Sequence, residues 1–290
     1  MHTGVPVHVR LAPAPSGTGI VFKRIDLDGF TIKATARNVA RVSYATSLMR
    51  KGVLISTTEH LLSALAACSI DNAIIEIDNL EIPIMDGSAL PFLKLIREAG
   101  ARQQRATRSW AKIVKPVEIV DGQKRIAIYP SEEFKITYRI SFNHPLIGEQ
   151  ERAFTMNQAG YERGIAPART FGFIDEVEML RQSGLVRGGS LENAVVLTKT
   201  GVMNPEGLRF PDEFCRHKIL DLMGDLVMLG YPLIGHVVVE GAGHAMHYAL
   251  VSRLLRERDA WTLTTADAIQ AGTPTRPPER VRPLASAASG

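Results

Sequence analysis

The segment from residue 211 to residue 229 constrains the fold most, because its polar and apolar residues separate at the period of an α-helix. His217, Asp221 and Asp225 recur every four residues and project from one face, while the isoleucine and leucines between them pack elsewhere. An imidazole and two carboxylates on one face can form the edge of a metal site. The same spacing also fits a hydrogen-bonded His/Asp pair on a solvated helix face, and both interpretations stay open at this point.

A second helix is expected over residues 57 to 68, where leucines mark a buried stripe. Ser56 and Glu59 have the spacing of a capping box, in which a hydroxyl and a carboxylate bind each other's free backbone amides. This spacing predicts that Glu59 and His60 lie in the first turn. Helix capping alone would explain Glu59, and a hydrogen bond near the helix start would explain His60.

Two further segments place polar residues at predicted turns. The run from 167 to 173 would present the hydroxyl of Thr170 and a neighbouring guanidinium between aromatic residues. The glycines in the run 241 to 243 follow an apolar strand-like segment and allow a sharp change of direction before His244. A histidine at such a strand-to-helix turn is well placed for proton transfer.

These segments, taken together, resemble one enzyme family. From His2 to about Leu255 the chain is similar to the zinc-dependent UDP-3-O-acyl-N-acetylglucosamine deacetylases of lipid A biosynthesis. The motifs that carry the resemblance, in register, are 59–65 (EHLLSAL), 82–88 (IPIMDGS), 142–145 (FNHP), 168–173 (ARTFGF), 188–190 (GGS), 204–210 (NPEGLRF), 212–214 (DEF) and 216–226.

The resemblance implies a metal site. Zinc in that family is bound by two histidines and an aspartate, which correspond here to His60, His217 and Asp221. Three protein ligands leave one coordination position open, as in catalytic rather than structural zinc sites. Glu59 then corresponds to the general base. Two histidines and a carboxylate also suit iron(II), so the donor set does not select the metal.

Other catalytic roles are likewise implied by the resemblance. Thr170 would donate a hydrogen bond to the oxyanion, and His244, as an imidazolium, would stabilise charge or act as the general acid. Asp225 would keep His244 charged, because a carboxylate within a few Å favours the cation. Lys218, next to the ligand His217, would contact polar groups of the substrate.

Substrate contacts are implied for several residues. Phe142 corresponds to the aromatic residue that stacks on the uracil ring, and Phe171 and Phe173 add aromatic walls. Lys124 would lie near the diphosphate, although this basic stretch equally fits a solvated turn. Residues 193–210 are expected to form an inserted strand-helix-strand unit. Its apolar residues would line a passage for the acyl chain, namely Val195, Val196, Leu197 and Val202.

Composition excludes some partners and selects none. The net charge of +4 mildly favours anionic partners such as a nucleotide diphosphate, and it leaves peripheral contact with a membrane surface open. Basic residues are scattered without a nucleic-acid motif, so no nucleic-acid partner is expected. No apolar run approaches about 18 residues, so no transmembrane segment is expected, and no signal peptide is visible. Only two cysteines, Cys68 and Cys215, are present, which indicates a cytoplasmic protein.

The polar stretch 97–105 divides the chain into two parts of similar strand-and-helix order. We therefore expect an α+β protein with domains at 1–105 and 106–262 and a disordered tail at 263–290. Strands are expected near 5–11, 18–25, 73–77, 112–119, 124–129, 134–141 and 236–240, and helices near 57–68, 89–99, 173–182, 211–229 and 244–256. The resemblance implies two layered α/β-sandwich domains with the metal site at their interface.

Two positions depart from the family pattern. Family members carry a further strand before the position of His2, whereas only Met1 precedes His2 here. An unpaired strand edge is therefore expected. His247 stands where an asparagine is usual. Such departures would suit a paralogue that binds a nucleotide-linked glycolipid without efficient turnover or deacetylates a related substrate. The joint presence of Glu59, Thr170 and His244 favours an enzyme, and the lack of a His-Glu-x-x-His motif disfavours a zinc peptidase.

Overall fold

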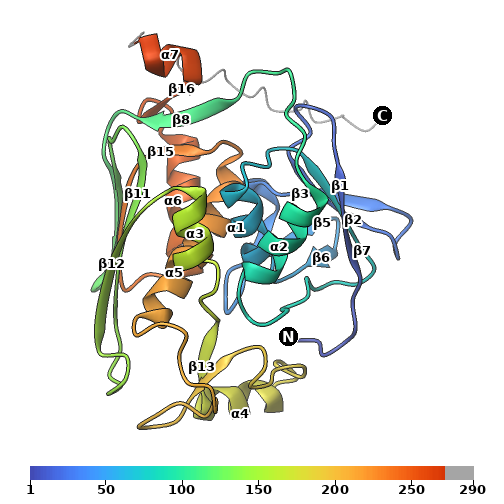
Figure 1. Ribbon diagram of the computed structural model, residues 1–290, viewed down its shortest axis with the longest axis vertical. Coiled ribbons are helices and arrows are strands. Elements are labelled where there is room, and N and C mark those ends of the chain that lie inside the picture. The colour runs from blue at the N-terminus through green and yellow to red at the C-terminus, as the bar shows by residue number, and fades with distance from the viewer. Residues whose placement is uncertain (272–290) are drawn as a thin grey trace, which may run out of the picture.

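The computed structural model describes residues 1–271, which form a mixed α+β protein (Figure 1). The helices are α1 (Glu59–Ala67), α2 (Leu90–Ala99), α3 (Gln158–Gly164), α4 (Ile174–Gln182), α5 (Glu213–Leu226), α6 (His244–Arg256) and α7 (Ala266–Ala271), with short 3-10 helices η1 (Ala36–Asn38) and η2 (Val227–Leu229). The strands are β1 (Val9–Pro13), β2 (Ile20–Arg24), β3 (Phe30–Lys33), β4 (Val39–Arg41), β5 (Ser47–Arg50), β6 (Val53–Ile55), β7 (Ala73–Ile77), β8 (Ser109–Ile113), β9 (Val117–Asp121), β10 (Lys124–Tyr129), β11 (Phe134–Ser141), β12 (Glu149–Thr155), β13 (Phe171–Phe173), β14 (Val195–Leu197), β15 (Leu233–Glu240) and β16 (Trp261–Thr265).

The first half of the chain contains a four-stranded sheet in the order β1-β7-β2-β3. Its strand β7 alternates buried and half-buried residues, as expected for a strand with one face against a core. The apolar stripes of α1 and α2 supply that core, and both helices lie beside the sheet (Figure 1). A smaller antiparallel sheet, β4-β5-β6, leads into α1.

The second half is built on a larger mixed sheet whose main path is β12-β11-β15-β10-β9. Its strand β15 runs parallel to β11 and β8 and antiparallel to β10, and Val237 and Val239 are fully buried. Figure 1 shows α5 and α6 between this sheet and the helices of the first half. The helices therefore form the middle of the molecule, with one sheet on either side.

Helix α5 is buried on nearly every side, because it packs against α1, α6 and β11. Its Gly224 faces the backbone of Glu59 on α1, and a Cβ atom at Gly224 would lie only 2.1 Å from the Glu59 carbonyl oxygen. Only glycine permits this approach. The close crossing brings the first turn of α1 next to the C-terminal half of α5.

The strand-helix-strand unit expected at 193–210 is wrong in position. The structure has β13, α4 and β14 over residues 171–197, with β13 and β14 parallel. The stretch after β14 contains only an isolated bridge between Leu197 and Val202, because turns interrupt it. Val195 and Leu197 belong to the buried core, and Leu197 also borders a hollow that Phe173 lines.

The disorder expected from residue 263 is wrong for the part of the tail that the structure describes. Strand β16 pairs with β8, and its Trp261 is buried with the indole Nε1 donating to the Leu254 carbonyl at 2.8 Å. Helix α7 follows directly. The remaining residues, 272–290, lie outside the described part of the chain. Within residues 1–271, no helix has the length and apolar character needed to cross a bilayer.

Candidate active site

The polar residues that recur every four positions on α5 face the interior of the protein. His217, Asp221 and Asp225 are all buried, so the alternative of a solvated helix face is wrong. The close crossing of α1 brings His60 to the same place, with the His60 and His217 rings 4.9 Å apart and nearly perpendicular. Side chains from the two halves of the chain thus lie side by side.

One group of side chains in this site has the geometry of a metal site. His60, His217 and Asp221 each offer a ligand atom, and these atoms lie within 4.8 Å of one another. The Nε2 atoms of His60 and His217 lie 3.6 Å and 3.3 Å from Asp221 Oδ1. A neutral imidazole and an ionised carboxylate are the forms that bind metal ions.

Protonation states in this group favour metal binding. Burial lowers the pKa of His217 to about 3, despite the opposing effect of Asp221. Burial alone would favour the neutral acid of Asp221, but the neighbouring Lys218 ammonium and the His244 imidazolium hold its pKa well below the usual range. His217 Nδ1 lies 3.0 Å from the Ala168 carbonyl and donates to it, which leaves the Nε2 lone pair facing Asp221. His60 Nδ1 is buried and has no hydrogen-bond partner within residues 1–271.

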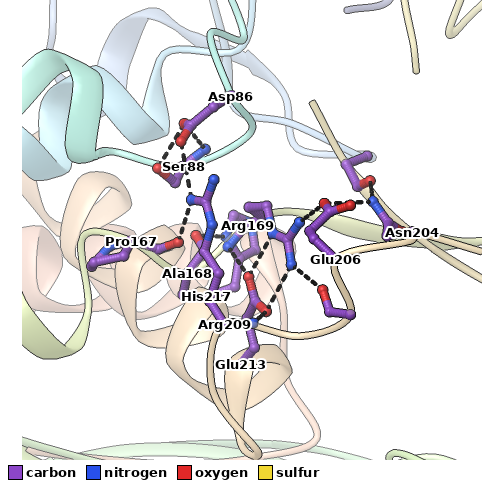
Figure 2. Close-up of polar contacts among 12 residues, drawn as sticks. Asp86, Ser88, Pro167, Ala168, Arg169, Asn204, Glu206, Arg209, Glu213 and His217 are labelled. Carbon is purple, nitrogen blue, oxygen red and sulfur yellow. Dashed lines mark hydrogen bonds and ion pairs between the residues drawn. The ribbon is translucent and has the colours of Figure 1, made fainter. Parts of the chain in front are cut away.

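The segment that carries Ala168 and Thr170 is fixed to the start of α5 by a buried ion pair (Figure 2). Arg169 is 2% exposed and donates from its backbone N and from Nε to Glu213 Oε1, at 3.0 Å and 2.9 Å. Its guanidinium also reaches Glu206 and the Gly207 carbonyl. Breaking such a buried pair typically costs about 3 to 5 kcal/mol. This pair therefore holds the backbone on which the His217 contact depends.

The same segment contacts the first half of the chain. The Thr170 backbone N donates to the Gly87 carbonyl at 2.8 Å. Arg209, which donates to the Pro167 carbonyl of this segment, forms an ion pair with Asp86 at 3.0 Å (Figure 2). Gly87 has φ +84°, and a Cβ there would lie 2.3 Å from the Asn193 carbonyl oxygen, so this turn requires glycine.

Glu59 does not form the predicted capping box, and that prediction is wrong. Helix α1 begins at Glu59 after Thr58, with no side-chain cap, and Ser56 forms an isolated bridge with Glu81 instead. Glu59 is buried, and its Oε2 accepts a hydrogen bond from the Thr46 backbone N at 2.9 Å. Burial raises the pKa of Glu59, although nearby histidines act in the opposite direction. The side chain is thus directed into the site rather than back to its own helix.

His244 is the first residue of α6 and pairs with Asp225. Its Nδ1 lies 2.7 Å from Asp225 Oδ2, and its Nε2 lies 3.8 Å from Asp221 Oδ2. Burial by itself lowers the pKa of His244, but the carboxylates of Asp225 and Asp221 outweigh burial and raise the pKa to about 9. These two carboxylates therefore favour the protonated form of His244.

Three residues around Asp225 have no assigned role in the sequence analysis. His247 Nδ1 lies 2.8 Å from Asp225 Oδ2, so two imidazoles share one carboxylate oxygen. His247 Nε2 lies 3.0 Å from the Tyr138 hydroxyl, which donates to the Ala242 carbonyl at 2.8 Å. Thr46 donates from Oγ1 to the other oxygen of Asp225 at 2.5 Å. His247 could be noticed in the sequence as one helical turn beyond His244, whereas no sequence pattern marks Tyr138 or Thr46.

A cleft of about 360 Å³ opens beside the His60, His217 and Asp221 group. The lining contains the following residues from the sequence analysis: Glu59, His60, Lys124, Thr170, Phe171, His217, Lys218, Asp221 and His244. Lys218 lies 3.1 Å from Asp221 Oδ2 and 5.6 Å from the centre of the Phe171 ring.

Two of the predicted substrate residues lie outside the lining of this cleft. Phe142 packs against Phe171 and Phe173, with ring centres 5.9 Å and 6.0 Å apart. Phe173 also borders a second hollow of about 320 Å³, together with His144 and Lys199. The aromatic residues thus form a wall between the cleft and this hollow.

Comparison with known proteins gives consistent matches. The family model described as UDP-3-O-acyl N-acetylglycosamine deacetylase matches residues 1–256. The chain is similar to the UDP-3-O-acyl-N-acetylglucosamine deacetylase of Solibacter usitatus (strain Ellin6076), with 53% identity over 92% of this chain and 90% of the relative. Proteins of the same name from Geobacter sp. (strain M21) and Myxococcus xanthus (strain DK1622) are 48% and 46% identical, over 91% and 92% of this chain and 87% and 85% of the relatives.

Proposed function

Since this chain belongs to the UDP-3-O-acyl N-acetylglycosamine deacetylase family, we propose that the cleft between α1, α5 and α6 is its active site. The chain is a deacetylase, a hydrolase that acts on the N-acetyl amide of UDP-3-O-acyl-N-acetylglucosamine in lipid A biosynthesis. The observation that carries the assignment to this cleft is that Glu59, Thr170 and His244 surround the His60, His217 and Asp221 group.

His60, His217 and Asp221 fit a divalent metal ion. Their donor atoms converge, His217 is held as a neutral ligand by the Ala168 carbonyl, and Nε2 of the buried His60 faces Asp221 Oδ1 at 3.6 Å. We propose zinc as the ion, and the same donors also suit iron(II). A bound divalent ion would polarise the amide carbonyl and lower the pKa of a water molecule.

Glu59 is proposed as the general base. Its carboxylate is fixed by the Thr46 amide beside the His60 side chain, so it is held next to the place where water would attack. Burial raises the pKa of Glu59, which makes the carboxylate a better proton acceptor near neutral pH. Glu59 would take one proton from water as the oxygen attacks the carbonyl carbon.

Thr170 and His244 are proposed to complete the hydrolysis. Thr170 lines the cleft beside His217, where its hydroxyl can donate to the oxyanion of the tetrahedral intermediate. His244, held as a cation by Asp225, can give a proton from Nε2 to the departing amine nitrogen. Lys218 adds a second positive charge, although its ammonium contacts Asp221 in the free protein.

Substrate binding is proposed along the aromatic wall. Lys124 and Phe171 line the cleft, which supports a diphosphate contact and an apolar contact near the reacting amide. Phe142 and Phe173 lie farther along the same wall, where a flat uracil ring can stack.

We also infer that the two halves of the chain are layered α/β-sandwich domains with the site at their interface. The support is that Glu59 and His60 come from α1, whereas the other proposed ligands come from α5 (Figure 1). We propose that the second domain extends to Thr265 rather than to 262, which the pairing of β16 with β8 supports. A cytoplasmic location is proposed because Cys68 and Cys215 are both free thiols.

The decisive experiment is a deacetylation assay with metal analysis of the same preparation. The metal-loaded protein is expected to release acetate from UDP-3-O-acyl-N-acetylglucosamine, and chelation followed by addition of Zn²⁺ or Fe²⁺ identifies the active ion. Binding of the substrate without acetate release would indicate a paralogue that has kept the fold and lost turnover.

A further inference from the structure

Thr46 lies between the two groups that the proposed mechanism uses for proton transfer. It directly precedes β5, is 2% exposed, and is separated in sequence from Asp225 by 179 residues. It is not among the residues that line the cleft. Each of its polar atoms nevertheless contacts either a proposed catalytic group or the helix that carries one.

The backbone of Thr46 is fixed to the start of α1. Its N–H donates to Glu59 Oε2 at 2.9 Å. Its carbonyl accepts from both the backbone N and the side-chain Oγ1 of Thr58, at 3.2 Å and 3.1 Å. Thr46 therefore moves with α1 and with the carboxylate of Glu59.

The side chain of Thr46 is fixed to the other half of the chain. Its Oγ1 donates to Asp225 Oδ1 at 2.5 Å and lies 3.3 Å from His244 Nδ1. The second oxygen, Oδ2, accepts from the imidazoles of His244 and His247. Without the threonine hydroxyl, the carboxylate can rotate about its Cβ–Cγ bond and weaken its contact with His244.

We propose that Thr46 is a positioning residue that sets the general base, Glu59, relative to the proton donor, His244. This inference rests on the proposed function of those two groups. Thr46 acts through both of them and touches no reacting atom. Its amide holds one proton-transfer group and its hydroxyl holds the partner of the other.

The test compares Thr46→Val, Thr46→Ala and Thr46→Ser in the metal-loaded protein. Valine and alanine remove the hydroxyl and keep the backbone amide, whereas serine keeps both. We expect kcat to fall about 10-fold to 100-fold in the first two variants, the range for losing a hydrogen bond to a charged group. KM and metal content are expected to stay close to those of the unsubstituted protein. In Thr46→Ser, kcat should stay within about threefold of the unsubstituted protein's kcat. Alanine serves as the second variant if valine prevents folding.

A matched control is available on β16. Thr264 is buried, and its Oγ1 has no hydrogen-bond partner in the described part of the chain, so Thr264→Val should leave kcat unchanged. The proposal is overturned if Thr46→Val and Thr46→Ala keep full kcat. It is equally overturned if serine fails to restore kcat, or if the loss appears as lost metal.

A second readout does not depend on turnover. In protein labelled with ¹⁵N-histidine, the Nδ1–H signal of His244 should shift in Thr46→Val and keep its position in Thr46→Ser. An unshifted signal in both variants would overturn the proposal. If the unchanged protein releases no acetate, the proposed function fails, and this signal still decides whether Thr46 positions His244.

Discussion

Gly224→Ala tests whether the active site depends on the close crossing of α1 and α5. The added Cβ would meet the Glu59 carbonyl oxygen at 2.1 Å, its carbon at 2.7 Å and its Cα at 2.9 Å. All three atoms are backbone, so no flexible side chain can yield. The contact must lengthen by about 1.3 Å to reach 3.4 Å, the near limit of ordinary contact.

The expected effects on stability and on function differ in size. Overpacking costs about 1 to 3 kcal/mol, while replacing glycine within a helix returns about 1 kcal/mol. The free energy of unfolding should therefore fall by about 2 kcal/mol or less, and the protein should stay folded. His60 and Glu59 would move with α1 away from His217 and Asp221 on α5. Misplacement by about 1 Å can cost about 100-fold in rate, so kcat/KM should fall by at least that factor.

The assay measures metal content, kcat/KM and the thermal midpoint of one preparation. Gly164→Ala on α3 is the matched helical control, since its Cβ would meet only Arg216 Nη1, at 3.4 Å. That variant should keep full activity. Unchanged metal content and activity in Gly224→Ala would refute the reasoning, because the site would then tolerate separation of the two helices.

The remaining predictions concern the proposed ligands and proton-transfer groups. His60→Ala and His217→Ala should each lower metal content and activity together, and full occupancy with full activity in both variants would remove them from the ligand set. Glu59→Gln should keep the fold and the metal but lose about 100-fold or more in kcat, measured beside a melting curve, since a positioned base is worth that much. His244 acts as an acid only while protonated, so activity should fall as pH rises through its pKa of about 9, measured as the alkaline limb of kcat against pH. Asp225→Asn should move that limb to lower pH, because the lost carboxylate no longer raises the pKa.

Elements with strong local signals were predicted closely. Helix α6 begins at His244 and ends at Arg256 as expected, because glycines precede it and an apolar stripe continues through it. Strands β7, β10 and β11 also have their expected bounds. The short strands β4, β5 and β6 were not predicted, since three or four residues carry too little alternation to stand out.

The convergence of His60 with α5 was predicted from a family resemblance, whereas its physical cause is visible only in the structure. No local pattern indicates that Gly224 faces another helix, because that contact joins distant parts of the chain. The Ser56 and Glu59 spacing shows the opposite case. The spacing fits a capping box, but Glu59 accepts a hydrogen bond from the distant Thr46 backbone N instead of capping its own helix.

The hydrogen bonds around Asp225 form a ring that is closed by the backbone between Ala242 and His244. Asp225 binds His247, His247 contacts the Tyr138 hydroxyl, and this hydroxyl contacts the Ala242 carbonyl. His244, two residues after Ala242 in the chain, binds Asp225 in turn. Tyr138 has one hydroxyl proton, and both the Ala242 carbonyl and His247 Nε2 are close enough to accept it. Which of them accepts the proton depends on whether His247 Nε2 already carries one. The loop that carries His244 to the cleft is thereby held by a hydroxyl on β11, the strand that pairs with β15 directly before this loop. A change at Tyr138 would be transmitted to the proton donor without altering any group that faces the substrate.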